Sequence, residues 1–373
     1  MPRLFSFLLC LTLALPALAD DVFRSQDYSI KVVTVADGLD YPWGLAFLPD
    51  GAMLVTERDE GTIRIVMPDG KKLPPLTGTP RVANSGQGGM LDVALDPDFA
   101  TNSFVYFSFS EPGDGGAGTA AARGVLDRAG NTLKNVEVLF RQYPKSGGGR
   151  HFGSRLVFSR DGHLLITTGD RGQRDRVQDS TINRGQVIRI NRDGSIPKDN
   201  PFVGRDGYRP ETWSLGHRNP QGAALHPETG KLWTVEHGAR GGDEVNIPEA
   251  GKNYGWPVIS YGVHYSGAKI GEGTQKEGME QPIHYWDPSI APGGMTFYTG
   301  DKFPKWHGNA FVSALKYQMV ARLTLDGEKV VAEERLFDGM GKRIRTVVDG
   351  PDGYLYLLVD DSDGEILRVE PTD

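Results

Sequence analysis

Apolar residues along this chain occur in short runs rich in Val, Ile, Leu, Phe and Tyr, and polar turns of the Asp-Gly or Asn-Gly type separate the runs. Apolar residues at helical spacing are almost absent. Short apolar runs joined by such turns are typical of β-strands and hairpins. The pattern therefore predicts an all-β protein.

One pattern recurs: an apolar strand, a Pro or Ser, a tight turn and a second apolar strand. Clear copies span residues 44–55, 156–166, 224–235 and 346–357, and weaker copies span residues 93–107 and 303–313. Their turns lie near positions 50, 102, 161, 230, 308 and 352, a mean spacing of about 60 residues.

A few antiparallel strands repeated at this spacing are typical of the blades of a β-propeller. Ring closure also removes the free sheet edges that promote aggregation. The repeat therefore predicts an all-β, six-bladed β-propeller, in which an N-terminal strand over residues 28–35 completes the last blade. A pair of β-sandwich domains is the alternative.

The first residues predict export. Arg3 precedes an apolar run over residues 4–18, and Ala17-Leu18-Ala19 forms a small-residue cleavage site before Asp20. The run is too short for a membrane anchor and no second apolar segment follows it, so it is typical of a secretory signal peptide. We therefore expect a signal peptide over residues 1–19, a single β-propeller domain over residues 20–373, a periplasmic or secreted protein and no membrane span.

Composition narrows the possible partners. The chain has 48 acidic and 41 basic residues and a formal net charge of -7, which gives no electrostatic basis for binding nucleic acid. Its 49 Gly and 24 Pro are spread along the chain, as expected for turn formers rather than for a disordered tail. The single cysteine, Cys10, lies in the predicted signal peptide, so the mature chain is expected to contain no disulfide.

Glycine-rich loops with polar or cationic side chains precede the predicted first strand of several blades. They span residues 85–90, 147–153, 216–222, 290–295 and 341–345. Propellers place their sites on one face, where loops from successive blades meet. If Arg218, Lys316, Arg343 and Arg345 converge there with His151, they form a strongly cationic pocket in an acidic protein. An ordinary turn with surface ion pairs is the alternative.

A second cluster of polar residues, over residues 236–246 and 253–257, combines carboxylates with a glycine-rich loop. Ca²⁺ accepts carboxylates and backbone carbonyls in a flexible geometry, although the spacing is not that of an EF-hand. No pair of histidines has the spacing of zinc ligands. The sequence favours calcium over zinc here.

Taken together, these loops resemble the soluble, pyrroloquinoline-quinone (PQQ)-dependent sugar dehydrogenases, particularly the bacterial aldose sugar dehydrogenase branch. The resemblance runs from residues 38–44 to residues 365–368 and is most specific at residues 216–222 and 241–256. It implies a six-bladed propeller that oxidises aldoses at the anomeric carbon to lactones, with PQQ and Ca²⁺ as cofactors. It also implies an electron acceptor, a quinone or a cytochrome, and a monomer or homodimer.

The resemblance also implies roles for individual residues. The catalytic base matches His151, and the carboxylate that orients it matches Asp170. The PQQ contacts match Gln87, Arg218, Asn219, Tyr265, Ala314, Leu315, Lys316, Arg343, Ile344 and Arg345. The ligands of a structural Ca²⁺ match Glu244 and the Tyr254 carbonyl, and those of a catalytic Ca²⁺ match the Gly238 and Ala239 carbonyls.

Two positions depart from the family pattern. Arg150 stands where the best-known glucose enzymes have an acid that helps to hold sugar, so a preference for glucose does not transfer. Ala239 stands where Pro is common, which matters little because its backbone is the implied ligand. No role is expected for five further histidines: His163, His226, His264, His284 and His307.

The chemistry agrees with the residue set, because no amino-acid side chain can accept a hydride and sugar oxidation therefore requires a redox cofactor. Two alternatives belong to other classes: a Ca²⁺-dependent propeller lactonase or hydrolase, and a non-catalytic binding propeller. The insertion over residues 266–280 has no counterpart in the repeat. Two roles are possible for it: it forms part of the substrate rim, or it forms a contact between subunits.

Overall fold

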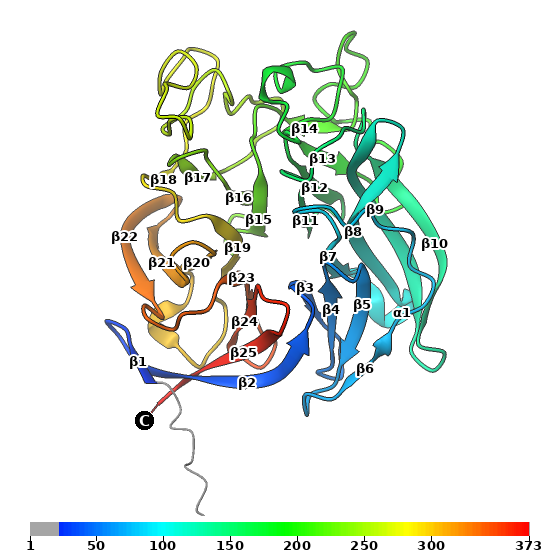
Figure 1. Cartoon of the computed structure of the whole chain (residues 1–373), viewed down its shortest axis with the longest axis vertical. Helices are drawn as coiled ribbons and strands as arrows, with labels where there is room; N and C mark the ends of the chain where they lie inside the picture. The colour runs from blue at the N-terminus through cyan, green and yellow to red at the C-terminus, as the bar shows by residue number, and fades with distance from the viewer. Residues whose placement is uncertain (1–21, 373) are drawn as a thin grey trace, which may run out of the picture.

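Six antiparallel β-sheets surround a central axis in the computed structural model, which describes residues 22–372 (Figure 1). This arrangement confirms the predicted all-β, six-bladed propeller. The predicted signal peptide, residues 1–19, lies outside the described residues.

The blades follow one another along the chain. The first two blades contain β3 (Pro42–Phe47), β4 (Met53–Glu57), β5 (Thr62–Val66) and β6 (Lys72–Pro75), then β7 (Met90–Leu95), β8 (Phe104–Gly113), β9 (Gly116–Asp127) and β10 (Thr132–Arg141). The third and fourth contain β11 (Gly153–Phe158), β12 (Leu164–Thr168), β13 (Val187–Ile190) and β14 (Thr212–Ser214), then β15 (Pro220–Leu225), β16 (Leu232–Glu236), β17 (Asp243–Asn246) and β18 (His284–Trp286). The fifth contains β19 (Pro292–Phe297), β20 (Ala310–Ala314), β21 (Met319–Asp326) and β22 (Lys329–Leu336).

The last blade joins the two ends of the chain. It contains β23 (Ile344–Asp349), β24 (Leu355–Val359) and β25 (Gly364–Pro371), and β2 (Ser29–Leu39) pairs with β25 as its outer strand. The predicted N-terminal strand therefore closes the ring. A short strand that the sequence did not indicate, β1 (Val22–Arg24), pairs with β2 and makes this sheet five-stranded.

The repeated turns found in the sequence connect the first and second strands of each blade. First strands face the channel and share one burial pattern, with their first four residues buried, and second strands are buried throughout in five of the blades. Neighbouring first strands contact each other around the whole ring, from β3 to β7 and onward to β23 and back to β3. Apolar side chains between adjacent sheets thus form the core.

One arginine side chain in the channel contacts all of the other blades. Arg155, on β11, donates to Asp92 at 2.9 Å, to the Gln221 carbonyl at 2.9 Å and to the Gly293 carbonyl at 3.2 Å. It also donates to Thr346 at 3.3 Å and stacks over the Trp43 ring at 4.2 Å. These five contacts come from the other five blades, so a single buried side chain links all six.

Helices are few, as the sequence predicts. Within residues 22–372 they are α1 (Phe99–Asn102) and two 3-10 helices, η1 (Arg174–Arg176) and η2 (Pro304–Trp306). None of them has the length and apolar character that a membrane crossing requires.

Candidate active site

Three adjoining cavities open where the loops before the first strands meet those after the second strands. The central compartment has a volume of about 620 Å³, the outer compartment about 750 Å³ and the cationic compartment about 520 Å³. Gln87 lines all three, and His151 and Arg218 line both the central and outer compartments. The three compartments therefore form one continuous site.

His151 and Asp170 lie together between the central and outer compartments. The Nδ1 atom of His151 is 2.6 Å from Oδ1 of Asp170. Asp170 also accepts from the Trp256 indole at 2.9 Å and from the Gly172 amide at 2.6 Å, and its side chain is 1 % exposed. His151 adopts φ of 56°, a left-handed conformation that is uncommon for a residue with a side chain and clusters at functional sites.

The environment sets the protonation of this pair. Burial lowers the pKa of His151 below its usual 6.5, and the positive charges of Arg218 and Arg150 act in the same direction, against the opposing effect of Asp170. Burial alone would raise the pKa of Asp170, but its contacts with His151 and Arg218 outweigh burial and lower it. At neutral pH the pair is therefore a neutral imidazole held by a carboxylate. With Nδ1–H donating to Asp170, Nε2 is the basic nitrogen.

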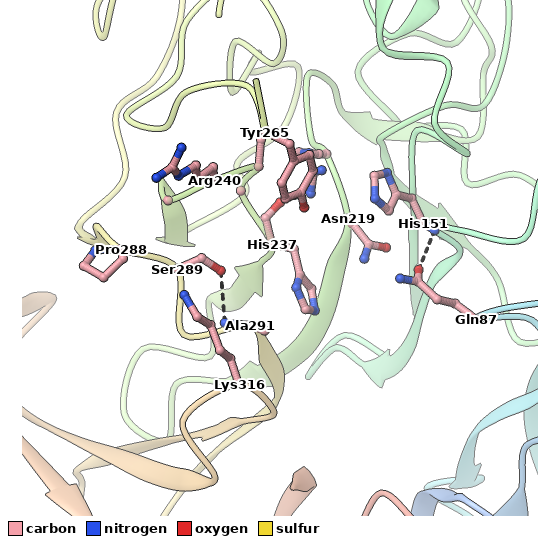
Figure 2. A pocket seen from close by; sticks show the side chains of 14 residues that line it. Gln87, His151, Asn219, His237, Arg240, Tyr265, Pro288, Ser289, Ala291 and Lys316 are labelled. Atoms are coloured by element: carbon pink, nitrogen blue, oxygen red, sulfur yellow. Dashed lines mark hydrogen bonds between the residues drawn. The ribbon is translucent and has the colours of Figure 1, made fainter. Parts of the chain in front are cut away.

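The central compartment gathers polar side chains from four blades (Figure 2). Gln87 Oε1 accepts from the His151 amide at 2.7 Å, and Asn219 Oδ1 accepts from the Gly153 amide at 3.0 Å. The Nε atom of Arg218 is buried without a hydrogen-bond partner within the described residues. Lys316 forms no ion pair within them. The compartment thus contains positive charge without a resident carboxylate to neutralise it.

The cationic compartment is arranged differently. Arg343 and Arg345 both pair with Asp360, at 3.2 and 2.9 Å, and Arg58 approaches the same carboxylate at 3.4 Å. Burial alone would raise the pKa of Asp360, but the three guanidiniums lower it. Arg345 is 5 % exposed, whereas the side chain of Arg343 is 48 % exposed. Arg58 also pairs with Asp59, at 2.7 Å, so Asp360 is the one carboxylate that pairs with Arg343 and Arg345 within residues 22–372.

Sequence reasoning missed several residues of this site, among them Arg58, His237 and Asp360. His237 lines the central and cationic compartments, and its Nε2 lies 3.0 Å from Gln221 Oε1, which also accepts from Arg345 at 3.0 Å. Burial, followed by the charge of Arg218, lowers its pKa well below 6.5. Each of these three residues directly follows the last residue of the second strand of its blade, and Asp170 lies two residues after the end of β12. This shared position could have identified them as candidates from the sequence.

A small fourth cavity, of about 10 Å³, adjoins the central compartment at Gly238 and is also lined by Glu236, Glu244 and Tyr254. Its volume is close to that of one water molecule. Burial raises the pKa of Glu244 to about 8, and the charge of Glu236 adds to the effect. Within residues 22–372 no cluster of three or more His, Cys, Asp and Glu side chains is arranged to hold a metal.

The structure brings most of the sequence-predicted residues to the site. Gln87, His151, Arg218, Asn219, Gly238, Ala239, Tyr265 and Lys316 line the central compartment, and Leu315, Arg343 and Arg345 line the cationic compartment. The side chains of Ala314 and Ile344 instead pack in the core between blades and are 0 % exposed, so only their backbone can face a ligand. Tyr265 stands at the rim and is 73 % exposed.

Comparison with known proteins identifies close relatives of this chain. Residues 39–368 match the family described as glucose / sorbosone dehydrogenase. The chain is 47 % identical to the aldose sugar dehydrogenase YliI of Escherichia coli (strain K12) over 347 residues, which cover 92 % of this chain and 93 % of that protein.

Solved structures of aldose sugar dehydrogenases also resemble this chain. The soluble aldose sugar dehydrogenase from Escherichia coli in its apo-form superposes with a TM-score of 0.90 at 47 % identity, covering 92 % of this chain and 100 % of that one. The PQQ-bound form of an aldose sugar dehydrogenase from Streptomyces coelicolor superposes with a TM-score of 0.78 at 32 % identity, covering 92 % and 98 %.

Proposed function

Because the chain belongs to the glucose / sorbosone dehydrogenase family, we propose that it is a PQQ-dependent enzyme that oxidises aldoses at the anomeric carbon to lactones. The observation that carries the proposal is the position of the His151–Asp170 pair at the wall of a compartment rich in unpaired cations. A proton acceptor and a site for an anionic redox cofactor therefore adjoin each other.

The residues present fit PQQ, which carries three carboxylates. Guanidinium and ammonium groups are the side chains that bind carboxylates most strongly. Arg218 and Lys316 in the central compartment have no carboxylate partner within the described residues, and Arg343 and Arg345 share Asp360 with Arg58. These cations would hold the cofactor, with Gln87 and Asn219 adding amide donors. A bound quinone supplies the hydride acceptor that no side chain provides.

His151 would remove the proton of the anomeric hydroxyl at Nε2. Asp170 fixes the ring in the tautomer that leaves Nε2 unprotonated and stabilises the imidazolium that forms when the proton arrives. Trp256 and the Gly172 amide hold Asp170 in turn, so the base cannot rotate away from the cavity. As the C1–H bond breaks with its electron pair, the O–H proton passes to His151 and the C1–O bond becomes the lactone carbonyl.

Calcium has two candidate positions. The cavity beside Glu244 has room for a single ion, and a carboxylate buried there beside Glu236 is stabilised by a cation. We propose that Glu244 and the Tyr254 carbonyl bind a structural Ca²⁺ and that the Gly238 and Ala239 carbonyls bind a second Ca²⁺. Gly238 and Ala239 line the central compartment, where the second ion supplies positive charge to developing anions.

The alternatives account for less of the site. A Ca²⁺-dependent propeller hydrolase needs carboxylates and Asn around a central metal, whereas the central compartment is lined by Arg218, Lys316 and His151 and by no carboxylate of the described residues. A non-catalytic binding propeller does not require a His151 in a left-handed backbone conformation whose ring is held by the buried Asp170. Four features stay predictions: export to the periplasm, a single domain over residues 20–373, a quinone or cytochrome as electron acceptor, and a monomeric or homodimeric state.

The proposal is tested by product analysis. Purified protein loaded with PQQ and Ca²⁺ should reduce an artificial electron acceptor when an aldose is added, with one lactone formed for each pair of electrons transferred. Hydrolysis of a lactone or phosphate ester without reduction of the acceptor would support the hydrolase instead. Sugar binding without any product would support the binding propeller.

A further inference from the structure

We propose, building on the proposed function, that the preferred substrates are aldoses that carry an anionic group, and that Arg150 recognises this group. The inference starts from the outer compartment, which adjoins the central compartment at His151. Arg150 lines the outer compartment together with His151 and Asp170, but it does not line the central one. A sugar bound in the outer compartment thus meets both the base and Arg150.

The guanidinium of Arg150 has no ion-pair partner. Within residues 22–372, no carboxylate lies within 4.0 Å of it, and its side chain donates no hydrogen bond. It lies across the turn after Asp170, where a Cβ added at Gly172 would collide with it. The absence of a side chain at Gly172 leaves room for this position.

The backbone of Arg150 is firmly held. Arg171 donates to the carbonyls of Arg150 and Gly148, the latter at 2.7 Å, and its guanidinium stacks on the Phe152 ring at 3.4 Å. Arg171 is 2 % exposed. A cation on a backbone that is already held loses only side-chain freedom when it binds a ligand. Arg150 is therefore an exposed cation without an ion-pair partner within residues 22–372, on a backbone that is held in place beside the base.

The other charges of the outer compartment do not neutralise Arg150. Arg174 pairs with Asp175 at 3.2 Å, and Asp175 is 86 % exposed. Arg176 pairs with Asp179 at 3.1 Å. Asp170 is occupied by His151 and Trp256. The outer compartment keeps an excess of positive charge in a protein whose net charge is -7.

A planar guanidinium matches the two oxygens of a carboxylate or of a phosphate. Two kinds of aldose carry such an anionic group: hexuronic acids have a carboxylate, and sugar phosphates have a phosphate. Oxidation at C1 would be the same for both: His151 would take the hydroxyl proton, and a bound quinone would supply the hydride acceptor. A neutral aldose offers Arg150 no anion, so the excess positive charge favours the charged sugars.

The experiment compares matched sugars on the PQQ- and Ca²⁺-loaded protein at physiological ionic strength, about 0.15 M. We expect kcat/KM for glucuronate or for glucose 6-phosphate to exceed that for glucose at least tenfold, and the larger ratio identifies the group recognised. Arg150→Gln should lower this ratio at least tenfold, and Arg150→Glu should reverse the preference. Using a ratio cancels differences in cofactor loading between variants.

Arg160→Gln is the matched control. It removes one positive charge from the opposite end of the same hairpin, about 20 Å away along the six residues of β11 and thus beyond the Debye length at physiological salt. The ratio should keep its wild-type value. A ratio near one in the wild-type protein, or an equal ratio in wild type and Arg150→Gln, would overturn the inference.

A binding measurement separates this inference from the proposed function. Methyl glucuronide cannot be oxidised at C1, because its anomeric oxygen is blocked, and calorimetry should detect tighter binding of it than of methyl glucoside. Arg150→Gln should remove that difference. Oxidation of neutral and anionic aldoses with equal kcat/KM would overturn this inference but leave the proposed function intact. Arg150-dependent binding of methyl glucuronide without oxidation of any aldose would overturn the proposed function.

Discussion

His151 and Asp170 face each other across one hairpin, with Nδ1 of the first 2.6 Å from Oδ1 of the second. The register of β11 and β12 explains the contact. Gly153 pairs with Thr168, so the residues two positions beyond each, His151 and Asp170, continue the same antiparallel alignment past the end of the sheet. The pair therefore depends on the hairpin as a rigid unit.

Removing either member of this pair should lower turnover. His151→Ala should keep the fold and the quinone but reduce kcat by about 10²–10⁴, the usual contribution of a positioned general base. Asp170→Asn should also reduce kcat, because an amide stabilises the imidazolium poorly. Steady-state kinetics at saturating sugar measure both effects.

His163→Ala serves as the control for these variants, since His163 lies at the turn of the same hairpin, at its far end. It should retain the wild-type kcat. A His151→Ala enzyme with a kcat comparable to the wild type would remove His151 from the mechanism.

The pKa of His151 provides an independent check. Burial lowers it below 6.5, and Asp170 opposes that shift, so NMR titration of the apoprotein should find a value below 6.5 in the wild type and a lower one in Asp170→Asn. The neutral base is present above its pKa, so kcat/KM should fall only as the pH decreases through the lowered value. A measured pKa above 6.5 would contradict the account of the site.

The cations of the cationic compartment should not behave alike. Arg343→Ala should weaken PQQ binding by about 1.5–3 kcal/mol, the range for a hydrogen bond to a charged partner, with little change in the free energy of unfolding. Arg345→Ala should weaken binding similarly and also destabilise the protein, because Arg345 is the nearest buried cation to Asp360.

Fluorescence titration with PQQ and urea unfolding measure the two quantities. Activity of both variants should partly recover at saturating PQQ. Unchanged PQQ affinity in both variants would show that these cations do not bind the cofactor.

How far the sequence predicts this structure depends on the kind of residue. The repeated turns at 50, 161, 230 and 352 predicted the blades because a tight turn and two apolar strands are local features. The loop that contains Arg218 was identified because its polar residues are contiguous. His237 and Asp360 were missed because nothing in their local sequence distinguishes them from other polar residues that follow a buried strand, and only the ring places them in one cavity with Arg345.

The packing between blades also could not be predicted from the sequence. Arg155 shows no pattern in the sequence, yet it contacts all the other blades through the channel. Ala314 and Ile344 were predicted as PQQ contacts, but strand alternation directs their side chains into the core. The sequence thus predicts elements and loops, whereas closure of the ring determines which side chains meet.

Calcium should stabilise the apoprotein through the cavity at Glu244. A ligand that binds only the folded state adds about 2.7 kcal/mol at a hundredfold excess over its Kd, so Ca²⁺ should raise Tm after chelator treatment. Glu244→Gln should abolish most of this increase. Glu277→Gln, at an exposed position that forms no ion pair within residues 22–372, should retain it. An equal increase in Tm for Glu244→Gln and wild type would exclude Glu244 as a ligand.

The central claim is that the cationic site binds PQQ and that Ca²⁺ makes it competent for aldose oxidation. The direct measurement is reconstitution of chelator-treated protein, produced without PQQ, in four arms: no addition, Ca²⁺ alone, PQQ alone, and both together. Aldose-dependent reduction of an artificial acceptor is followed in each arm, with Tm measured in parallel. We expect folded but inactive protein without PQQ, little activity with PQQ alone, and full activity with a raised Tm when both are present. Full activity without PQQ, or no change in activity and Tm with both, would contradict the account.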